Sequence, residues 1–379
     1  MSSAFNTYSQ LTVDLDAIAS NYQFLRSQVG TSLCAAVLKA DAYGCGIEAV
    51  APALYNSGCR HFFTAYTDEA IVLKNVLSSF QQKTFIYVLN GPYLKGWTDF
   101  YKQNNLIPVL NNLFEIEEWH AYAKIIDQRL PAILHINTGM NRHGLPLNDY
   151  QAFLNKDWPL IDWKFVMSHL SCSDQPNHPA NVKQLKSMQA IQKDFPKTPL
   201  CFANSNGIFL GSNYHFNMVR PGISLYGLNS VLEQRNKLAP TLELKSRIVQ
   251  IQDIKPGDYV GYSESYQAKS PMRLATLAIG YADGVPWRIS NQGVYVHIKE
   301  NIKAPIVGRI SMDLMTIDIT HVSDVQVGEW VTLLDKVISI DDWANFAGTI
   351  NHEILLKLGK RMRRNYNIDC YNQIEAVSC

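Results

Sequence analysis

The chain has 379 residues, 47% of them hydrophobic, and a formal net charge of +1. A chain of this length can bury a large core, so one large domain or two smaller domains are expected. The near-neutral charge and the lack of long lysine or arginine runs exclude the electrostatic footprint of a protein that binds nucleic acid or an anionic membrane. We therefore expect small molecules as partners.

The cysteines and the N-terminus indicate where the protein works. Seven cysteines are scattered along the chain without a C-x-x-C pair, which fits a reducing compartment better than a disulfide framework. The N-terminus lacks a basic segment followed by an apolar one, and nowhere do 18 apolar residues follow one another. A cytoplasmic protein without a membrane span is expected.

The first part of the chain alternates short apolar runs with helix-compatible segments. LTVDL at 11–15 predicts a strand, and Asp16 is expected to cap a helix that extends to about Val29. Eight further runs follow: CAAVLK, HFFTAY, TFIYVLN, LIPVLN, AILHIN, KFVMSH, LCFANS and NMVRPG. Alternating strands and helices predict a parallel sheet, and eight repeats close a barrel. We expect an α/β fold with a (β/α)8 TIM barrel over residues 11–235.

Beyond Leu238 one strand pattern follows another. Strands are expected at LELKSRIVQIQDI, DYVGYS, RLATLAIGY, GVYVHI, APIVGRI, LMTIDIT and EWVTLLD, separated by turn signals such as PGD and ADG. An amphipathic helix from about Asp341 to Lys360 and a short tail close the chain. This pattern predicts a mostly β C-terminal domain over residues 236–379, to which a strand in residues 1–10 is a candidate addition.

One lysine stands at the end of an apolar run. The stretch CAAVLKADAYGCG carries Lys39 where the run gives way to a loop that contains glycine. A lysine at the carboxyl end of a buried strand can point its amine into a desolvated pocket, which makes it a candidate Schiff-base former. Taken alone, a surface lysine after a core strand is the more ordinary interpretation, so its neighbours have to decide.

Polar residues follow the other barrel strands as well. Barrel enzymes carry their active sites at the carboxyl ends of the strands. Besides Lys39, the sequence places there Tyr43, Asn137, Arg142, His169, Asn204, Ser205, Arg220 and Gly222. The S-N-G and R-P-G-I segments supply backbone amides and a hydroxyl for an anion, at the usual phosphate site of such barrels. A lysine opposite a phosphate site predicts a phosphorylated aldehyde cofactor, and pyridoxal phosphate fits that description.

Seven segments then resemble a known family. They are A-V-L-K-A-D-A-Y-G, T-G-M-N-R, A-N-S-N, M-V-R-P-G-I-S-L-Y-G, V-G-Y-S, G-Y-A-D-G and V-G-R-I-S-M-D. In this order, and over the whole chain, they are similar to the motif series of bacterial alanine racemase. The resemblance implies a pyridoxal phosphate-dependent isomerase that interconverts L-alanine and D-alanine and supplies D-alanine for peptidoglycan.

The resemblance also implies roles for single residues. Lys39 would hold the cofactor as an imine, and Lys39 and Tyr262 would be two bases on opposite faces of the substrate. Two faces are needed because a proton must leave one side of the α-carbon and return on the other. Arg220 would contact the pyridine nitrogen, with His169 as a relay to Tyr262. Further implied contacts are Tyr43, Asn204, Ser205, Gly222, Ile223 and His352 with the cofactor, and Arg142, Tyr281 and Met312 with the substrate.

In the family the β domain of one subunit serves the barrel of the other. The resemblance therefore implies a homodimer with shared active sites, in which Tyr262, Tyr281 and Met312 serve the partner's Lys39. Some positions depart from the family pattern. His135 stands where many members carry a carbamylated lysine that orients the arginine matching Arg142. His352 replaces a tyrosine beside the phosphate, and Cys45 and Ser263 replace a histidine and a glycine.

Several alternatives stay open on the sequence. One is a racemase of broader specificity, for serine, lysine or arginine; others are a related decarboxylase and a non-catalytic pyridoxal phosphate carrier. The β domain with Tyr262 argues against the carrier, and Arg220 in place of a carboxylate argues against the decarboxylase. Four histidines, His135, His143, His169 and His178, could suggest a zinc cluster, but their spacing matches no metal pattern, so no metal is expected.

Overall fold

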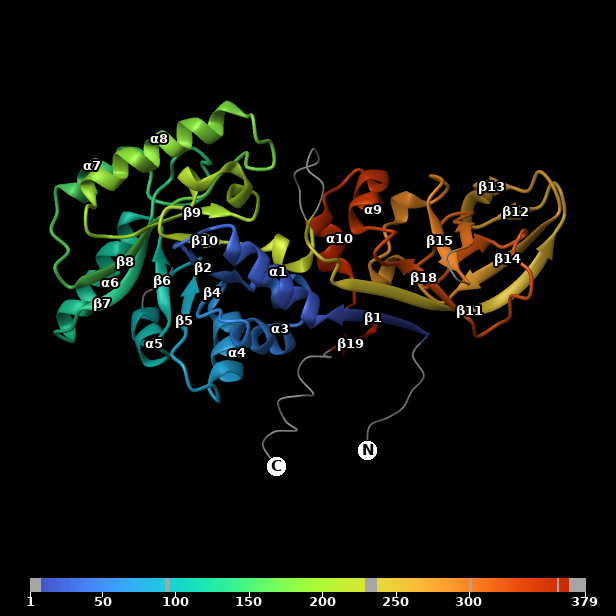
Figure 1. Ribbon diagram of the computed structural model, residues 1–379, viewed down its shortest axis with the longest axis horizontal. Helices are drawn as coiled ribbons and strands as arrows, with labels where there is room; N and C mark the ends of the chain where they lie inside the picture. The colour runs from blue at the N-terminus through green and yellow to red at the C-terminus, as the bar shows by residue number, and fades with distance from the viewer. Residues whose placement is uncertain (1–7, 93–95, 229–236, 300–301, 360, 368–379) are drawn as a thin grey trace. The chain divides into compact units, whose positions relative to one another are not determined.

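The computed structural model describes residues 8–92, 96–228, 237–299, 302–359 and 361–367. The chain divides into two compact units (Figure 1), one formed by Ala17–Ala239 and the other by Met1–Asp16 together with Pro240–Cys379. The boundary expected between residues 235 and 236 lies outside the described residues. We call the first the barrel unit and the second the β unit.

The barrel unit contains a closed parallel sheet. Its strands are β2 (Leu33–Cys34), β3 (Ala36–Val37), β4 (His61–Thr64), β5 (Phe85–Val88), β6 (Ile107–Leu110), β7 (Leu130–His135), β8 (Ile161–Met167), β9 (Leu200–Asn204) and β10 (Met218–Arg220). They are joined in the order β2-β10-β9-β8-β7-β6-β5-β4-β3. Only Ala35 separates β2 from β3, so one extended stretch pairs with the last strand through β2 and with the next strand through β3. The expected (β/α)8 barrel is confirmed.

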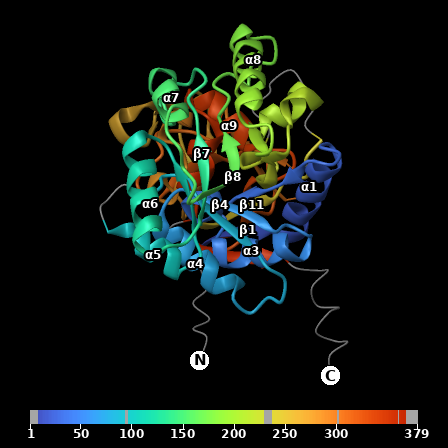
Figure 2. The same cartoon turned by 90° about the vertical axis from the view of Figure 1, so that its left-hand side faces the viewer.

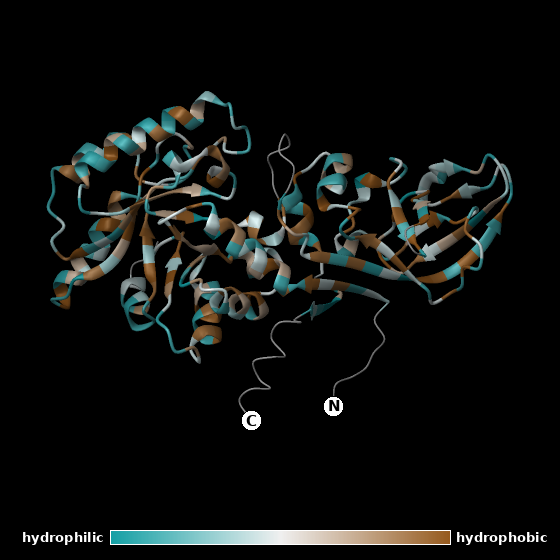
Figure 3. Cartoon of the chain, viewed as in Figure 1, coloured by the Kyte–Doolittle hydropathy of each residue, from teal (hydrophilic) through white to brown (hydrophobic). Residues whose placement is uncertain are grey.

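Helices surround these strands. They are α1 (Leu15–Ser27), α2 (Lys39–Tyr43), α3 (Ile47–Asn56), α4 (Thr67–Leu77), α5 (Trp97–Gln103), α6 (Leu113–Ile125), α7 (Leu147–Leu154) and α8 (Pro179–Asp194). Figure 2 shows β4, β7 and β8 in the middle of the unit and the longer helices around them. Parallel strands covered in this way are apolar on both faces. In Figure 3 the barrel strands are largely brown, the colour of hydrophobic residues, whereas the helices alternate between hydrophilic teal and brown.

Aromatic side chains fill the barrel interior. The rings of Phe63 and Tyr87 stack with centroids 4.6 Å apart, and Phe165 meets Tyr87 edge-on at 6.3 Å. His61 lies against Tyr87 as well, with its Nδ1 2.9 Å from the tyrosine hydroxyl. These residues form a packed core, and active sites of such barrels lie at the loops after the strands.

The β unit is built on a long bent strand, β11 (Leu242–Ile254). The other strands are β1 (Ser9–Asp14), β12 (Tyr259–Val260), β13 (Tyr266–Gln267), β14 (Met272–Leu277), β15 (Tyr295–Ile298), β16 (Ile302–Pro305), β17 (Met315–Asp318), β18 (Trp330–Leu334) and β19 (Arg363–Asn367). Their order is β16-β15-β18-β11-β1-β19, with β14 pairing both β11 and β17. The expected mostly β domain is confirmed.

Strand β1 corrects one expectation. The sequence pattern placed residues 11–15 at the start of the barrel, but β1 pairs antiparallel with β11 and parallel with β19. Periodicity identified this strand without identifying its partners. In addition, Asp16 lies in the first turn of α1 and does not precede it, a position where its negative charge favours the helix dipole.

The C-terminal part differs from expectation in two ways. The single helix expected over Asp341–Lys360 is two helices, α9 (Ile340–Ala347) and α10 (Asn351–Lys357), because Gly348 adopts a left-handed φ of 66° that ends the first. The short tail contains strand β19. Among the described residues, no helix combines the length and the apolarity that crossing a bilayer requires.

Candidate active site

Lys39 opens a left-handed turn at the mouth of the barrel. It follows the first barrel strand after one residue, and the next four residues, Ala40–Tyr43, have φ angles of 53°, 55°, 53° and 56°. Such a backbone costs roughly 1–2 kcal/mol per residue with a side chain, so contacts must hold it. Asp41 supplies two of them, since its carbonyl accepts from the Gly46 amide at 2.9 Å and its Oδ1 accepts from the Ile47 amide at 2.8 Å.

The surroundings of Lys39 disfavour its charge. Burial lowers the pKa of the Lys39 amine, the guanidinium of Arg142 lowers it further, and Arg220 adds to the effect, while the carboxylate of Glu69 raises it. Lowering the pKa of a lysine increases the share of neutral amine that can attack a carbonyl carbon. The arrangement therefore suits a lysine that forms covalent bonds with carbonyl compounds.

Arg220 places a fixed positive charge at the same mouth. It ends β10 and is 4% exposed; its Nη2 donates to the Ser168 carbonyl at 2.9 Å and lies 3.2 Å from Nδ1 of His169. Within the described ranges this guanidinium forms no ion pair with a carboxylate. Burial lowers the pKa of His169 well below its usual value, and Arg220 lowers it further, so the imidazole is neutral and accepts from the guanidinium.

The loops after β9 and β10 form a cradle of polar hydrogens. Buried Ser205 accepts through its Oγ from the amides of Gly222 at 2.8 Å and Ser224 at 3.2 Å, and the 3-10 helix η3 (Ile223–Tyr226) begins directly after Gly222. The hydroxyl of Ser224 is fully buried and has no hydrogen-bond partner in the part of the chain that is described. The hydroxyls of Ser205 and Ser224 thus gather at the start of a helix, where an anion is favoured.

Gly222 leaves room for the side chain of Tyr43. A Cβ at Gly222 would lie 2.3 Å from the Tyr43 hydroxyl oxygen, closer than any real contact, so only glycine admits the phenol beside the cradle. The ring of Tyr43 packs on that of Tyr226, with centroids 5.0 Å apart. Burial raises the pKa of the Tyr43 phenol, so this group is neutral and can donate a hydrogen bond.

Asn204 and Gln184 hold the neighbouring loops. The Oδ1 of Asn204 accepts from the Gly207 amide and from Ser173 Oγ, each at 2.9 Å, so this oxygen braces its own loop. Gln184, on α8, donates to Thr138 Oγ1 at 3.1 Å and to the His169 carbonyl at 2.9 Å. Sequence reasoning missed Gln184, because a glutamine on an amphipathic helix gives no sign that it is buried.

Arg142 and His135 lie on either side of one turn. Arg142 is exposed in the loop after β7, where Asn137 Oδ1 accepts from the amides of Gly139 and Asn141, both at 3.0 Å. His135 is buried at the end of β7, with its Nδ1 2.8 Å from Asn111 Oδ1. Burial, followed by the charge of Arg220, lowers the pKa of His135 to about 3, so it is neutral.

The four histidines considered for a zinc site lie in different surroundings. His178 precedes α8 and caps it, with its Nδ1 accepting from the Ala180 amide at 3.2 Å. The rings of His135 and His143 lie edge to face, with centroids 6.0 Å apart. Across the described residues, no group of three or more His, Cys, Asp or Glu side chains is placed to hold a metal ion.

The other candidate residues lie on the β unit. Tyr262 opens the 3-10 helix η4 (Tyr262–Glu264) and Tyr281 opens η5 (Tyr281–Asp283), so neither lies in the strand that its motif predicted. Backbone bonds of 3.1 Å from Tyr281 to Ser311 and 3.0 Å from Ala282 to Met312 bring the G-Y-A-D-G and I-S-M-D motifs together. His352 lies on α10, with its Nδ1 2.8 Å from Asn351 Oδ1.

Comparison with known proteins identifies the family of this chain. Residues 13–230 match the model of the alanine racemase N-terminal domain, and residues 241–366 match that of the alanine racemase C-terminal domain. The chain belongs to the alanine racemase family. It is 41% identical over 360 residues to a catabolic alanine racemase of Agrobacterium fabrum, covering 94% of this chain and 91% of that protein. It is 39% identical over 373 residues to an alanine racemase of Brucella ovis, covering 94% and 93%.

Solved structures of the alanine racemase family show the same fold. The alanine racemase of Bartonella henselae, with covalently bound pyridoxal phosphate, superposes with a TM-score of 0.90 at 37% identity, over 95% of this chain and 99% of that one. The biosynthetic alanine racemase of Pseudomonas aeruginosa superposes with a TM-score of 0.87 at 28% identity, over 96% and 100%. The resemblance inferred from seven short motifs is thus confirmed over both units.

Proposed function

We propose that this protein is an alanine racemase that interconverts L-alanine and D-alanine with pyridoxal phosphate as its cofactor. The observation that carries the proposal is the barrel mouth, where a half-buried lysine with a lowered pKa shares one site with an anion cradle and with an arginine that has no ion-pair partner among the described residues. Membership of the alanine racemase family supports the same conclusion.

The residues of the barrel mouth fit this cofactor. Lys39 would attach to its aldehyde carbon, the cradle of Ser205, Gly222 and Ile223 with the Tyr43 phenol would hold its phosphate, and Arg220 would face its pyridine nitrogen. A guanidinium has only hydrogen-bond donors, so Arg220 would donate to that nitrogen. The bound cofactor would draw electron density from the amino acid's α-carbon and so make the proton there removable.

Two groups would then move that proton. The amine of Lys39 would serve one face of the α-carbon, and the phenol of Tyr262 would serve the other. A phenol has an ordinary pKa of about 10, so it needs positive charge nearby to act as a base at neutral pH. The Arg220–His169 pair would supply such a charge, with the neutral imidazole between the guanidinium and the phenol. Arg142 and the backbone at Met312 would bind the substrate carboxylate.

We further propose a homodimer in which the β unit of one chain completes the site of the other. In the single chain Tyr262 is 71% exposed, Met312 53% and Tyr281 44%. Such exposed side chains could contact the barrel of a second chain. In a two-fold dimer each chain would give its barrel to one active site and its β unit to the other. We also propose a cytoplasmic location and a D-alanine supply for peptidoglycan, as the sequence analysis expects.

Chemical trapping tests the proposal directly. Purified protein supplied with pyridoxal phosphate should absorb visible light, and borohydride should fix the cofactor on Lys39. A peptide map with the cofactor on another lysine would refute the assignment. Racemisation should then be measured with alanine, serine, lysine and arginine. Alanine is expected to give the highest kcat/KM, whereas a higher value for lysine or arginine would establish the broader racemase.

A further inference from the structure

We propose that Glu69 is a positioning residue for Lys39: its carboxylate holds the left-handed turn that begins at Lys39 against the loop between β4 and α4. The proposal rests on the proposed function, in which Lys39 carries the cofactor. Neither the motifs of the sequence nor the family comparison singled out Glu69, which looks in the sequence like an ordinary acidic residue in the first turn of a helix.

The two carboxylate oxygens of Glu69 have different partners. Oε2 accepts from the amides of Ala65 at 2.8 Å and Tyr66 at 3.2 Å, which is a capping bond at the start of α4. Oε1 accepts from the amide of Ala40 at 2.6 Å. Ala40 is the residue after Lys39 and the first with a left-handed φ, so this bond acts where the unfavourable backbone begins.

The second bond exceeds what helix capping requires. A capping side chain needs one acceptor oxygen, and Glu69 uses its other oxygen on a chain segment 29 residues away. A neutral glutamine has one acceptor oxygen, so it can serve the cap or the turn but not both. Aspartate keeps the charge and two oxygens but is one methylene shorter, so it can cap α4 without reaching Ala40.

The negative charge of Glu69 also affects the pKa of Lys39. The pKa of Lys39 is lowered chiefly by burial and then by Arg142 and Arg220, and Glu69 raises it against them. His169 is another group close enough to interact, and it is neutral. Glu69 thus offsets two arginines at the nitrogen that is to carry the cofactor and keeps this nitrogen from losing its proton at too low a pH.

The experiment compares the wild-type holoenzyme with Glu69→Gln and Glu69→Asp. Two quantities are measured: the pH midpoint of the visible absorbance of cofactor bound to Lys39, and kcat and KM for alanine. Glu69→Gln should lower the pH midpoint by about 0.5–1 unit because it removes an anion. It should also lower kcat by about tenfold or more, with KM within about twofold, because a charge-assisted bond to the turn is lost.

Glu69→Asp separates charge from geometry. It should lower kcat in the same way and leave the pH midpoint at the wild-type value. Ala40→Gly supplies a rescue, because glycine adopts a left-handed φ at little cost. In Glu69→Gln, this second change should restore much of kcat while the pH midpoint stays low. Asp342→Asn is the matched control: Asp342 accepts from the Ser339 amide at 3.1 Å in the capping box of α9.

The possible results point in different directions. If wild-type protein does not bind pyridoxal phosphate on Lys39, the proposed function itself fails. If it does, and Glu69→Gln and Glu69→Asp both keep wild-type kcat and pH midpoint, or change them no more than Asp342→Asn does, Glu69 is only a helix cap. If Glu69→Gln does not fold, Glu69→Asp and its Ala40→Gly double variant decide the positioning role by the kcat loss and its rescue.

Discussion

The barrel unit and the β unit prepare their candidate residues in opposite ways. At the barrel mouth, Arg220 and Ser205 are buried and each makes short bonds to backbone groups before any ligand arrives. On the β unit, Tyr262 and Met312 are more than half exposed. The candidate binding groups of the barrel are thus fixed in place within the chain, whereas those of the β unit are open to solvent in the single chain.

This difference separates binding from proton transfer. Groups that hold a cofactor gain from being fixed in advance, because little ordering is then lost on binding. A tyrosine that is to accept a proton needs a dry, positively charged environment, which water around an exposed phenol does not provide. We therefore expect changes in the barrel to abolish cofactor attachment, and changes on the β unit to spare attachment and affect turnover.

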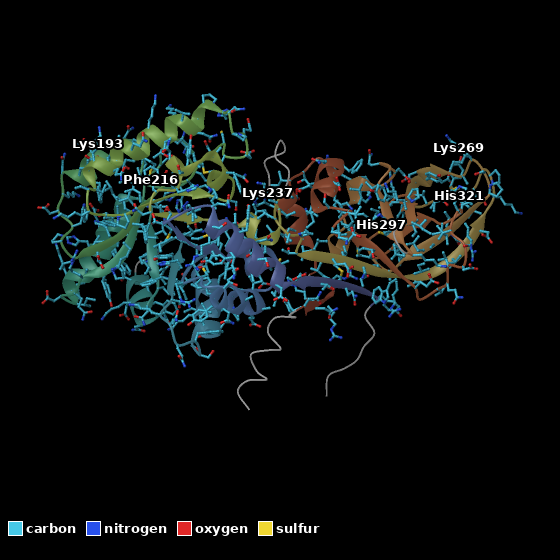
Figure 4. The ribbon with its side chains drawn as sticks, viewed as in Figure 1. Lys193, Phe216, Lys237, Lys269, His297 and His321 are labelled. Carbon is cyan, nitrogen blue, oxygen red and sulfur yellow. The ribbon has the colours of Figure 1, made fainter. Side chains whose placement is uncertain are left out.

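The largest effect is expected at the barrel mouth. Lys39→Ala removes both the covalent anchor and one base, so racemisation should fall by at least about 10⁴-fold, the upper range for one positioned acid-base group. The visible absorbance of the bound cofactor should disappear with it. Lys193→Ala is the control: this exposed lysine lies on α8 (Figure 4), and its loss should leave both readouts unchanged. Retained absorbance in Lys39→Ala would contradict the assignment.

On the β unit, Tyr262→Phe should act on turnover alone. The loss of one base should lower kcat by about 10²–10⁴-fold, while the cofactor stays attached at Lys39. Exchange of the α-proton with solvent deuterium should survive for the enantiomer that Lys39 serves and collapse for the other. Equal losses for both enantiomers would count against two bases on opposite faces.

Mixing two inactive variants tests whether the units of different chains meet. Lys39→Ala and Tyr262→Ala chains are unfolded and refolded together, so that about half of the dimers pair one of each by chance. Each mixed dimer has one intact site if the β unit serves the partner's barrel, and about a quarter of wild-type activity should return. If proven mixed dimers stay inactive, both groups of a site come from the same chain.

The smallest effect concerns acid. Burial lowers the pKa of His61 to about 4 and that of His135 to about 3, below the unfolded value of about 6.5. Between these values the unfolded chain binds the proton and the folded barrel does not, so stability falls as the pH falls from about 6.5 towards 4. At pH 5 each histidine should cost about 2 kcal/mol.

Hydrogen exchange resolved by peptide can measure this loss of stability at low pH in the barrel unit. Protection of the barrel strands should decrease between pH 7 and pH 5, and His61→Phe should reduce the slope, because one titrating group is gone. His297, labelled in Figure 4 on strand β15, provides a variant in the β unit whose replacement should leave the slope of the barrel peptides unchanged. Barrel protection that does not change over this range would contradict the prediction.

The sequence predicted the elements far better than their partners. The barrel strands were predictable because each is a short apolar run between turn signals, and motif order pointed to the family. The pairing of β1 with β11 was not predictable. A strand pattern does not tell which other strand, here more than 200 residues away, it will pair with. The sequence pattern predicts one continuous helix across Gly348, because the apolar periodicity resumes after this residue.

For the candidate site, residue types were predictable and conformation was not. Lys39, Arg220 and Ser205 stand out by chemistry at strand ends, and the structure places all three on the barrel unit. The left-handed turn at Ala40–Tyr43 has no signature of its own, since alanine and tyrosine rarely adopt a positive φ. Gln184 and Glu69 were missed because hydrogen bonds to segments far away in the sequence depend on tertiary neighbours.

The pairing of β1 also sets an order of events during synthesis. Its residues leave the ribosome before those of its partner strands. Ser9 bonds to Ser246, which is made 237 residues later, and Gln10 pairs with Arg363. At about 5–20 residues per second, the interval between Ser9 and Ser246 lasts roughly ten to fifty seconds. The barrel can be completed in that time, because its last strand, β10, ends at Arg220. The nascent chain therefore carries an unpaired strand ahead of a finished domain, and a strand that is translated before the barrel is paired only after it.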